Sequence, residues 1–334
     1  MRPILYEVVL VVPPSFDECA LFADFSGPGP NRSKNRPLVF AAFRYARGRV
    51  PIELPPDEAH LFYLVPDTEL DQPGTLEPAL RHGALYRQWM SADERARCDR
   101  YVFVQGRNEY TLTRALTRSV LSQMTGCLPN ELVFAPGPHG KPRLVQPAGH
   151  LHFNVSNTRG LLMLLVMRDC EVGVDVENVT RHLAMADVAH RFFAPQEAAA
   201  MLALPPSQQP ERFFTLWTLK EAYAKARGVG LSLPLDDFSF VFGSLGSLAL
   251  APNPQRTRPQ TPKPGTENET ETQAASRFSL GTFRLGENHL ASWALQRRPE
   301  AATTLRLFAV CPSTGQFHPK GHPRHIAQTQ PNNR

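Results

Sequence analysis

Two acidic residues separated by a single valine stand in the segment Gly173-Val174-Asp175-Val176-Glu177. The valines predict a buried strand, and residues two apart on a strand face the same side. Asp175 and Glu177 should therefore point together, and neighbouring carboxylates repel each other unless a cation lies between them. Oxygen ligands of this kind suit Mg²⁺, which takes one or two carboxylates together with phosphate oxygens and water. Taken alone, the pattern fits a solvated strand end even better than a metal site.

A second pair of charged residues, Glu221 and Lys225, lies in an expected helix. Because they are four positions apart, their side chains share one helix face. By itself this spacing is typical of a surface ion pair, which contributes about 0.3–0.5 kcal/mol. Lys220 is expected to point elsewhere, into solvent. Gly228 and Gly230 follow, and glycines just past a helix are typical of a C-cap and a tight turn.

Groups that could bind phosphate precede these residues in the chain. Lys141 lies between a glycine and a rigid proline, and the segment 153–158 places Ser156 and Asn157 at a strand end. Lysine, hydroxyl and amide groups can all bind phosphate, although ordinary turn chemistry explains the same residues. Between residues 95 and 118 the chain also carries arginines, for which a solvated or carboxylate-paired face is the usual explanation. They are Arg95, Arg97, Arg100, Arg107, Arg114 and Arg118.

Alternating and 3.6-residue hydrophobic patterns predict the elements that position these groups. Strands are expected at 60–65, 132–134, 151–156, 161–167, 172–176, 238–242, 277–280, 289–295 and 304–310. Helices are expected at 76–90, 108–125, 184–204 and 211–227, and Ser91 should cap a helix of its own. Three polar or proline-rich segments should lie outside the folded body. They are a partly disordered N-terminal extension over 1–54, a disordered insert over 251–276 and a disordered tail over 313–334.

Composition limits the classes of function. The chain has 334 residues and a net charge of +5, which fits an anionic partner without choosing among nucleic acid, membrane, acidic protein or phosphorylated ligand. Its five cysteines form no CxxC pair, which argues against a disulfide framework or a zinc cage and fits a reducing compartment. The longest apolar run, 161–167, has the length of a strand, so we expect a cytoplasmic protein with no membrane partner.

Together, the order and spacing of these segments resemble the 4′-phosphopantetheinyl transferase superfamily. The resemblance is carried by the GVDVE and WTLKEAYAKARGVGL segments, by Gly140-Lys141-Pro142 and by the FNVS segment that ends at Ser156. It covers roughly 55–312 without the insert, and it is strongest to the larger, two-lobed, monomeric kind that serves peptide and polyketide synthases. The resemblance implies an α+β fold, a pseudo-dimer of two similar lobes over 55–168 and 169–312. The active site should lie in the cleft between the lobes.

The same resemblance implies a role for each candidate residue. Asp175, Glu177 and Glu221 correspond to the acidic magnesium site, and Lys225 to a lysine near the pyrophosphate of coenzyme A. Groups touching the nucleotide part of coenzyme A correspond to Lys141, Ser156, Asn157 and, in a looser alignment, Arg107. Many members have histidine where this chain has Asn157, and asparagine can donate a hydrogen bond but carries no charge.

The implied reaction is the Mg²⁺-dependent transfer of phosphopantetheine from coenzyme A to a serine of an apo acyl or peptidyl carrier protein, which leaves 3′,5′-ADP. Glu221 is our first choice for the general base, with Glu177 second. Fatty-acid, polyketide and nonribosomal peptide carriers are all open as substrates. A non-catalytic, carrier-binding relative is the main alternative. A basic nucleic-acid-binding protein is the other, although no nucleic-acid-binding motif is visible.

Overall fold

The computed structural model describes residues 8–12, 22–25, 52–65, 76–242, 248–253, 274, 276–298 and 302–310. The helices are α1 (Leu76–Trp89), α2 (Ala92–Asp99), α3 (Val104–Thr125), α4 (Met185–Phe192), α5 (Pro195–Leu202) and α6 (Gln209–Arg227), followed by the 3₁₀ turn Gly230–Ser232. The strands are β1 (Val8–Val12), β2 (Phe22–Phe25), β3 (Glu58–Leu64), β4 (Val133–Pro136), β5 (Pro142–Gln146), β6 (Leu151–Thr158), β7 (Leu161–Arg168), β8 (Val172–Asn178), β9 (Phe238–Phe242), β10 (Leu248–Pro252), β11 (Phe278–Leu285), β12 (His289–Gln296) and β13 (Thr303–Ala309). The chain is therefore of the α+β class, as expected.

Two halves of the chain repeat one connectivity. In the first, β3 leads through α1, α2 and α3 to the hairpin β6–β7, and β7 pairs antiparallel with β3. In the second, β8 leads through α4, α5 and α6 to the hairpin β11–β12, and β12 pairs antiparallel with β8. The two sheets run in the orders β1-β13-β3-β7-β6 and β2-β11-β12-β8. This repeated plan agrees with the expected pair of similar lobes.

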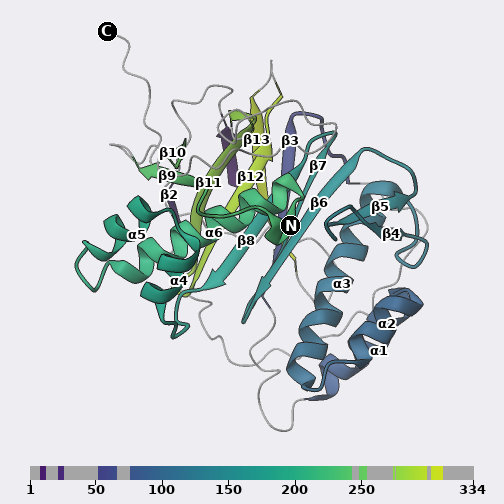
Figure 1. Cartoon of the computed structure of the whole chain (residues 1–334). Coiled ribbons are helices and arrows are strands. Elements are labelled where there is room, and N and C mark those ends of the chain that lie inside the picture. Colours follow the sequence, from purple (N-terminus) through teal and green to yellow (C-terminus); the bar gives the residue numbers. More distant parts are fainter. Residues whose placement is uncertain are drawn as a thin grey trace, which may run out of the picture.

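The two sheets pack against each other, and helices cover their outer faces (Figure 1). Alternate residues of β3 and β7, such as Leu61 and Leu165, share one buried cluster with Val174 and Trp293 of the second sheet. The opposite face of β3 and β7 packs against α3. The outer face of β11 and β12 packs against α4, α5 and α6. Because side chains alternate along a strand, each sheet can serve two cores at once.

Helix boundaries follow local chemistry. Ser91 caps α2 in a capping box with Glu94, as predicted. The single helix expected over 184–204 is wrong, because it is two helices that meet at Phe193 and Ala194. Both of these residues are extended, and Pro195 begins α5. A proline disfavours helical conformation in the residue before it and has no N–H for the preceding turn, so the helix must restart there.

One strand crosses the expected boundary between the lobes, and the boundary itself stays a prediction. β13 lies within 169–312 but pairs in parallel with β3 of the first sheet, and its Leu305 and Leu307 are buried in the core between the sheets. The start of the expected insert also forms structure, since β10 extends to Pro252. Most of the predicted extension and insert, and all of the predicted tail, lie outside the described residues. Among the helices that the structure describes, none is long and apolar enough to cross a membrane.

Candidate functional site

The acidic strand and the charged helix lie directly against each other. Gly173, Asp175 and Glu177 alternate with the core valines of β8, so they share the opposite face of the strand. A Cβ added to Gly173 would lie 2.0 Å from the carbonyl oxygen of Ala222 in α6. Glycine at this position therefore allows α6 to approach β8 closely enough for Lys225 to reach the carboxylate of Asp175.

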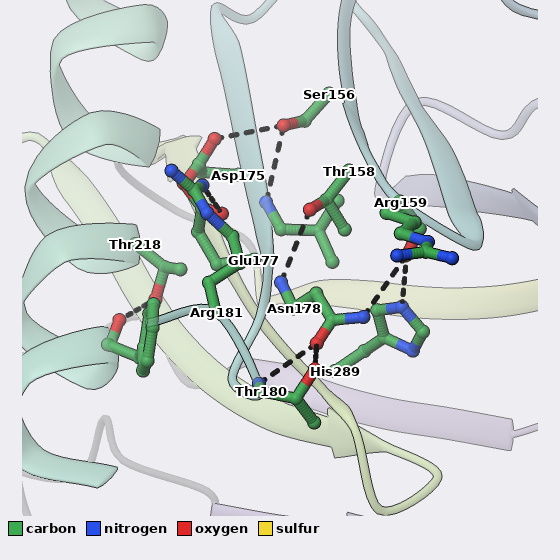
Figure 2. Close-up of polar contacts among 12 residues, drawn as sticks. Ser156, Thr158, Arg159, Asp175, Glu177, Asn178, Thr180, Arg181, Thr218 and His289 are labelled. Atoms are coloured by element: carbon green, nitrogen blue, oxygen red, sulfur yellow. Dashed lines mark hydrogen bonds and ion pairs between the residues drawn. The ribbon is translucent and has the colours of Figure 1, made fainter. Parts of the chain in front are cut away.

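Three polar groups meet at Asp175. Lys225 Nζ lies 2.6 Å from its Oδ1. The hydroxyl of Ser156 donates a hydrogen bond to the same oxygen at 2.9 Å (Figure 2). Lys225 Nζ also lies 3.2 Å from the oxygen of Ser156. Asp175 is 6% exposed, and its Oδ2 is buried without a hydrogen-bond partner among the described residues. The two lobes thus contribute jointly to one site, with Ser156 from β6 and the other residues from β8 and α6.

Two further carboxylates lie in the electrostatic field of Asp175. Burial, followed by the negative charge of Asp175, raises the pKa of Glu221 above its usual value, while Lys225 lowers it. The same two causes raise the pKa of Glu177, against the lowering effects of Arg181 and Lys225. Arg181 Nη1 lies 2.5 Å from Oε2 of Glu177 (Figure 2). Raised pKa values of this kind are typical of buried acids, and a neighbouring negative charge adds to the effect of burial.

This arrangement contains oxygen donors of the kind that a hard divalent cation prefers. The predicted trio of Asp175, Glu177 and Glu221 is electrostatically coupled, and one oxygen of Asp175 has no protein partner. Among the described residues, no three acidic, histidine or cysteine side chains are already arranged as metal ligands, and Lys225 and Arg181 neutralise two of the acids instead. The donor chemistry fits Mg²⁺, and the metal assignment stays a prediction.

The residues predicted to touch a nucleotide are distributed over a wider area. Lys141 is nearly buried, with Nζ 2.7 Å from Glu171 and 2.9 Å from the carbonyl oxygen of Val172. Burial lowers the pKa of Lys141, whereas the charge of Glu171 raises it. Asn157 is exposed on β6 beside Ser156. Arg107, in the first turn of α3, donates to the carbonyl oxygen of Tyr101 at 3.2 Å, away from the contacts that join the acidic cluster.

The structure also tests the predicted helix C-cap and the predicted pairing of the arginines. The C-cap at Gly228 is confirmed, with φ of 64° in the left-handed region. For Arg114 and Arg118, the carboxylate-paired interpretation is confirmed, since both form ion pairs with Glu94.

The prediction that Lys220 points into solvent is wrong. Its side chain is fully buried and forms an ion pair with Glu197 at 2.8 Å. Lys220 Nζ also donates to the carbonyl oxygens of Leu235 and Phe238. Glu197 in turn accepts hydrogen bonds from the backbone N–H of Ala194 and that of Phe240. A buried lysine is tolerated only with such partners. The sequence around Glu197 looked like an ordinary helix and gave no indication that Glu197 is the partner.

Comparisons with known proteins agree on one family. Residues 171–278 match the model of the 4′-phosphopantetheinyl transferase superfamily, and residues 76–167 match that of the 4′-phosphopantetheinyl transferase N-terminal domain. A putative 4′-phosphopantetheinyl transferase of Synechocystis is 34% identical over 148 residues, which are 44% of this chain and 60% of that protein. The 4′-phosphopantetheinyl transferase HetI of Nostoc is 34% identical over 178 residues, which are 53% of this chain and 71% of HetI. The match thus spans less than two thirds of the Synechocystis relative.

Among solved structures, the holo-[acyl-carrier-protein] synthase of Thermotoga maritima is similar with a TM-score of 0.27 and 20% identity. The match covers 38% of this chain and 63% of that one.

Proposed function

Because the chain belongs to the 4′-phosphopantetheinyl transferase superfamily, we propose that it transfers the 4′-phosphopantetheine group of coenzyme A to a serine of an apo acyl or peptidyl carrier protein. The products would be the holo-carrier and 3′,5′-ADP. One observation carries the proposal: the two lobes bring Ser156, Asp175 and Lys225 into mutual contact beside two further carboxylates. Phosphoryl transfer depends mainly on positioning and charge stabilisation, and this cluster can supply both.

Asp175, Glu177 and Glu221 are proposed as the ligands of Mg²⁺. When bound, the ion would neutralise the charge of the pyrophosphate and of the leaving group. The partnerless Oδ2 of Asp175 and the mutual repulsion of the trio support this assignment. Arg181 would have to release Glu177 for that carboxylate to become a ligand.

Glu221 is the proposed general base, with Glu177 as the second choice. The serine hydroxyl of the carrier forms a new P–O bond to the β-phosphorus of coenzyme A, and its proton passes to the carboxylate. The bond between that phosphorus and the 3′,5′-ADP oxygen breaks, and Lys225 stabilises or protonates the departing phosphate. The raised pKa of Glu221, caused first by burial, makes it a better proton acceptor than an exposed glutamate.

Lys141, Ser156, Asn157 and Arg107 remain proposals for the nucleotide part of coenzyme A. Lys141 would have to exchange at least part of its contact with Glu171 for phosphate. Asn157 is exposed and can approach a ligand without rearrangement, but as a neutral hydrogen-bond donor. The net charge of +5 would favour encounter with both an anionic cofactor and an acidic carrier. We further propose a cytoplasmic monomer.

The test is to incubate the full chain with coenzyme A, Mg²⁺ and a panel of apo carrier proteins, and then to measure the intact mass of each carrier. A gain of one phosphopantetheine, lost with EDTA and lost in Asp175→Ala, is the expected result. If coenzyme A binds but no carrier gains mass, the chain is a non-catalytic relative. Failure to bind coenzyme A would overturn the proposal as a whole.

A further inference from the structure

Two edge strands meet where the lobes join. β6 is the last strand of the five-stranded sheet, and β8 is the last strand of the four-stranded sheet. Each pairs through its backbone with a strand on one side only, and the open edges face each other across the lobe boundary. The N–H and C=O groups along such an edge need other partners, because unpaired buried backbone groups are costly.

Side chains of β6 supply those partners in a regular series. The N–H of Val174 donates to Oδ1 of Asn154 at 2.9 Å. The N–H of Val176 donates to Oγ of Ser156 at 3.2 Å. The third contact, at 3.2 Å, runs from the N–H of Asn178 to Oγ1 of Thr158 (Figure 2). Both strands advance by two residues per contact, so the lobes are joined by a ladder of side chain to backbone hydrogen bonds, here called the Asn154–Ser156–Thr158 ladder.

Two carbonyl groups on the same edge of β8 also have side-chain partners. Lys141 Nζ donates to the carbonyl oxygen of Val172 at 2.9 Å, and Lys225 Nζ to that of Val174 at 3.3 Å. The edge of β8 is therefore held by polar side chains from β6, from the residue just before β5 and from α6. A backbone that is hydrogen-bonded at every second residue cannot slide along β6 without breaking several contacts at once.

The acidic residues alternate with the residues that the ladder binds. Asp175 lies between Val174 and Val176, and Glu177 lies between Val176 and Asn178. We infer that Asn154 and Thr158 are positioning residues, which fix β8 on either side of Asp175 and Glu177 so that both carboxylates face the site at a set depth. Ser156 also holds Asp175 directly, because its hydroxyl donates a hydrogen bond to that carboxylate. The inference rests on the proposed function, in which these carboxylates hold a divalent cation.

Asn154 is 7% exposed and Thr158 is partly buried, and both project from the same face of β6 as Ser156. These polar side chains occupy every second position of β6 and are largely shielded from water, so their hydrogen bonds are made within the protein. Groups that support ligating side chains from behind typically change metal affinity by about 10-fold to 100-fold when they are removed. The ladder should therefore affect metal binding more than it affects the fold.

The decisive variant is Thr158→Val, which keeps the shape of the side chain and removes the acceptor for Asn178. Mn²⁺ would serve as a spectroscopic probe, with its affinity for the full chain measured by electron paramagnetic resonance in the presence of coenzyme A. We expect the affinity to fall by about 10-fold, at the lower end of the range for such supporting groups. Exchange of the Asn178 amide with deuterium should become faster, and Thr158→Ser should restore both properties.

Thr125→Val is the matched control. Thr125 is also partly buried and hydrogen-bonded, but it binds the carbonyl oxygen of Leu121 within α3. This variant should leave the Mn²⁺ affinity and the exchange of the Asn178 amide unchanged. Asn154→Leu removes the first contact of the ladder and should weaken Mn²⁺ binding as Thr158→Val does.

The outcomes separate the two proposals. If Thr158→Val speeds exchange at Asn178 but leaves the Mn²⁺ affinity at the wild-type value, the ladder has only a structural role and the inference is overturned. A wild-type chain that binds no Mn²⁺ would overturn it as well. If the Mn²⁺ affinity depends on the ladder but the wild-type chain modifies no carrier, the proposed transfer is contradicted and the positioning role is supported.

Discussion

Lys225 Nζ lies 2.6 Å from Oδ1 of Asp175, although the two residues are 50 positions apart in the chain. The contact joins α6 to β8 and depends on Gly173, which removes the Cβ that would hold the helix away. Sequence spacing suggested that Lys225 forms an ordinary surface ion pair with Glu221 in the same helix. In the structure, Lys225 has a partner outside that helix. Lys225 thus has a defined location at the site before any ligand binds.

Lys225→Ala is expected to slow phosphopantetheine transfer by about 100-fold to 1000-fold, the usual cost of removing one preorganised group that stabilises developing charge. The rate would be measured at saturating Mg²⁺ by mass spectrometry of the carrier. Arg87→Ala serves as a control for the loss of one positive charge, because Arg87 pairs with Asp99 on the surface of the first lobe. A near-normal rate for Lys225→Ala would remove this lysine from the mechanism.

Removal of divalent cations by EDTA is expected to stop transfer, and added Mg²⁺ should restore it, because three carboxylates around one site require a cation to approach a pyrophosphate. Glu221→Gln keeps the shape of the side chain but removes both a ligand charge and the proposed base, so transfer should slow. Turnover would be followed as release of 3′,5′-ADP. Glu109→Gln, on α3, changes the net charge by the same amount and should behave like the wild type. Full activity in EDTA would contradict the metal assignment.

Gly173→Ala is expected to destabilise the fold, because the new Cβ would clash with the backbone of α6. Overpacking of this kind costs about 1–3 kcal/mol or more. Urea unfolding measures the loss, and transfer activity should fall with it as Lys225 moves away from Asp175. Gly83→Ala in α1 is the matched control, since a Cβ there meets no atom within 4 Å. It should stabilise the helix by about 0.5–1 kcal/mol. Equal stability of the two variants would contradict the close packing of α6 on β8.

Glu171 should make part of the stability depend on pH. Burial alone would raise its pKa, but the hydrogen bond from His152 and the charge and hydrogen bond of Lys141 outweigh burial and lower the pKa from 4.5 to about 2. A carboxylate whose pKa is depressed by folding stabilises the protein above the unfolded value of 4.5, and this stabilisation is lost as the pH falls toward 2.

The urea midpoint of the wild type should therefore drop more between pH 5 and pH 3 than that of Glu171→Gln. The comparison with the variant isolates Glu171 from other carboxylates that titrate in the same range. Parallel curves for the two proteins would show that the ion pair with Lys141 does not persist in solution.

The buried pair of Lys220 and Glu197 predicts strongly non-additive variants. Lys220→Met alone leaves Glu197 buried without its counter-charge, and breaking a buried pair in this way typically costs about 3–5 kcal/mol. The double variant Lys220→Met with Glu197→Leu removes both charges and should recover part of that loss, though the backbone groups that the pair binds remain unsatisfied. Thermal or urea unfolding of the single and double variants tests this. Simple addition of the two single effects would mean that the charges are not coupled.

Hydrophobic periodicity predicted most of the elements of this fold. β8 and α6 were identifiable because valines alternate along one and because the other has a glycine at its C-cap. Spacing placed Asp175 with Glu177 on one strand face and Glu221 with Lys225 on one helix face. Only the resemblance to the superfamily suggested that the two pairs act together. What brings the two faces together is the close approach at Gly173, which only the structure reveals.

Contacts between distant segments were outside the reach of such patterns. The segment 153–158 was interpreted as groups that could bind phosphate, which stays a prediction for Ser156 and Asn157. The contacts of Asn154, Ser156 and Thr158 with the backbone of β8 were not predicted. Lys220 looked like any surface lysine, because its burial depends on Glu197 and on two carbonyl groups beyond the end of α6. Local sequence cannot specify partners of that kind.

The parallel pairing of β13 with β3 joins residues 303–309 to residues 58–64, and β13 lies inside its sheet, between β1 and β3. On the ribosome, β3 emerges long before β13, the strand that pairs with one of its edges. Until residues 303–309 are synthesised, one edge of β3 has no strand to pair with and exposes apolar side chains, a condition that invites association with other nascent chains. The five-stranded sheet can therefore be completed only late in translation, even though most of its strands are translated early.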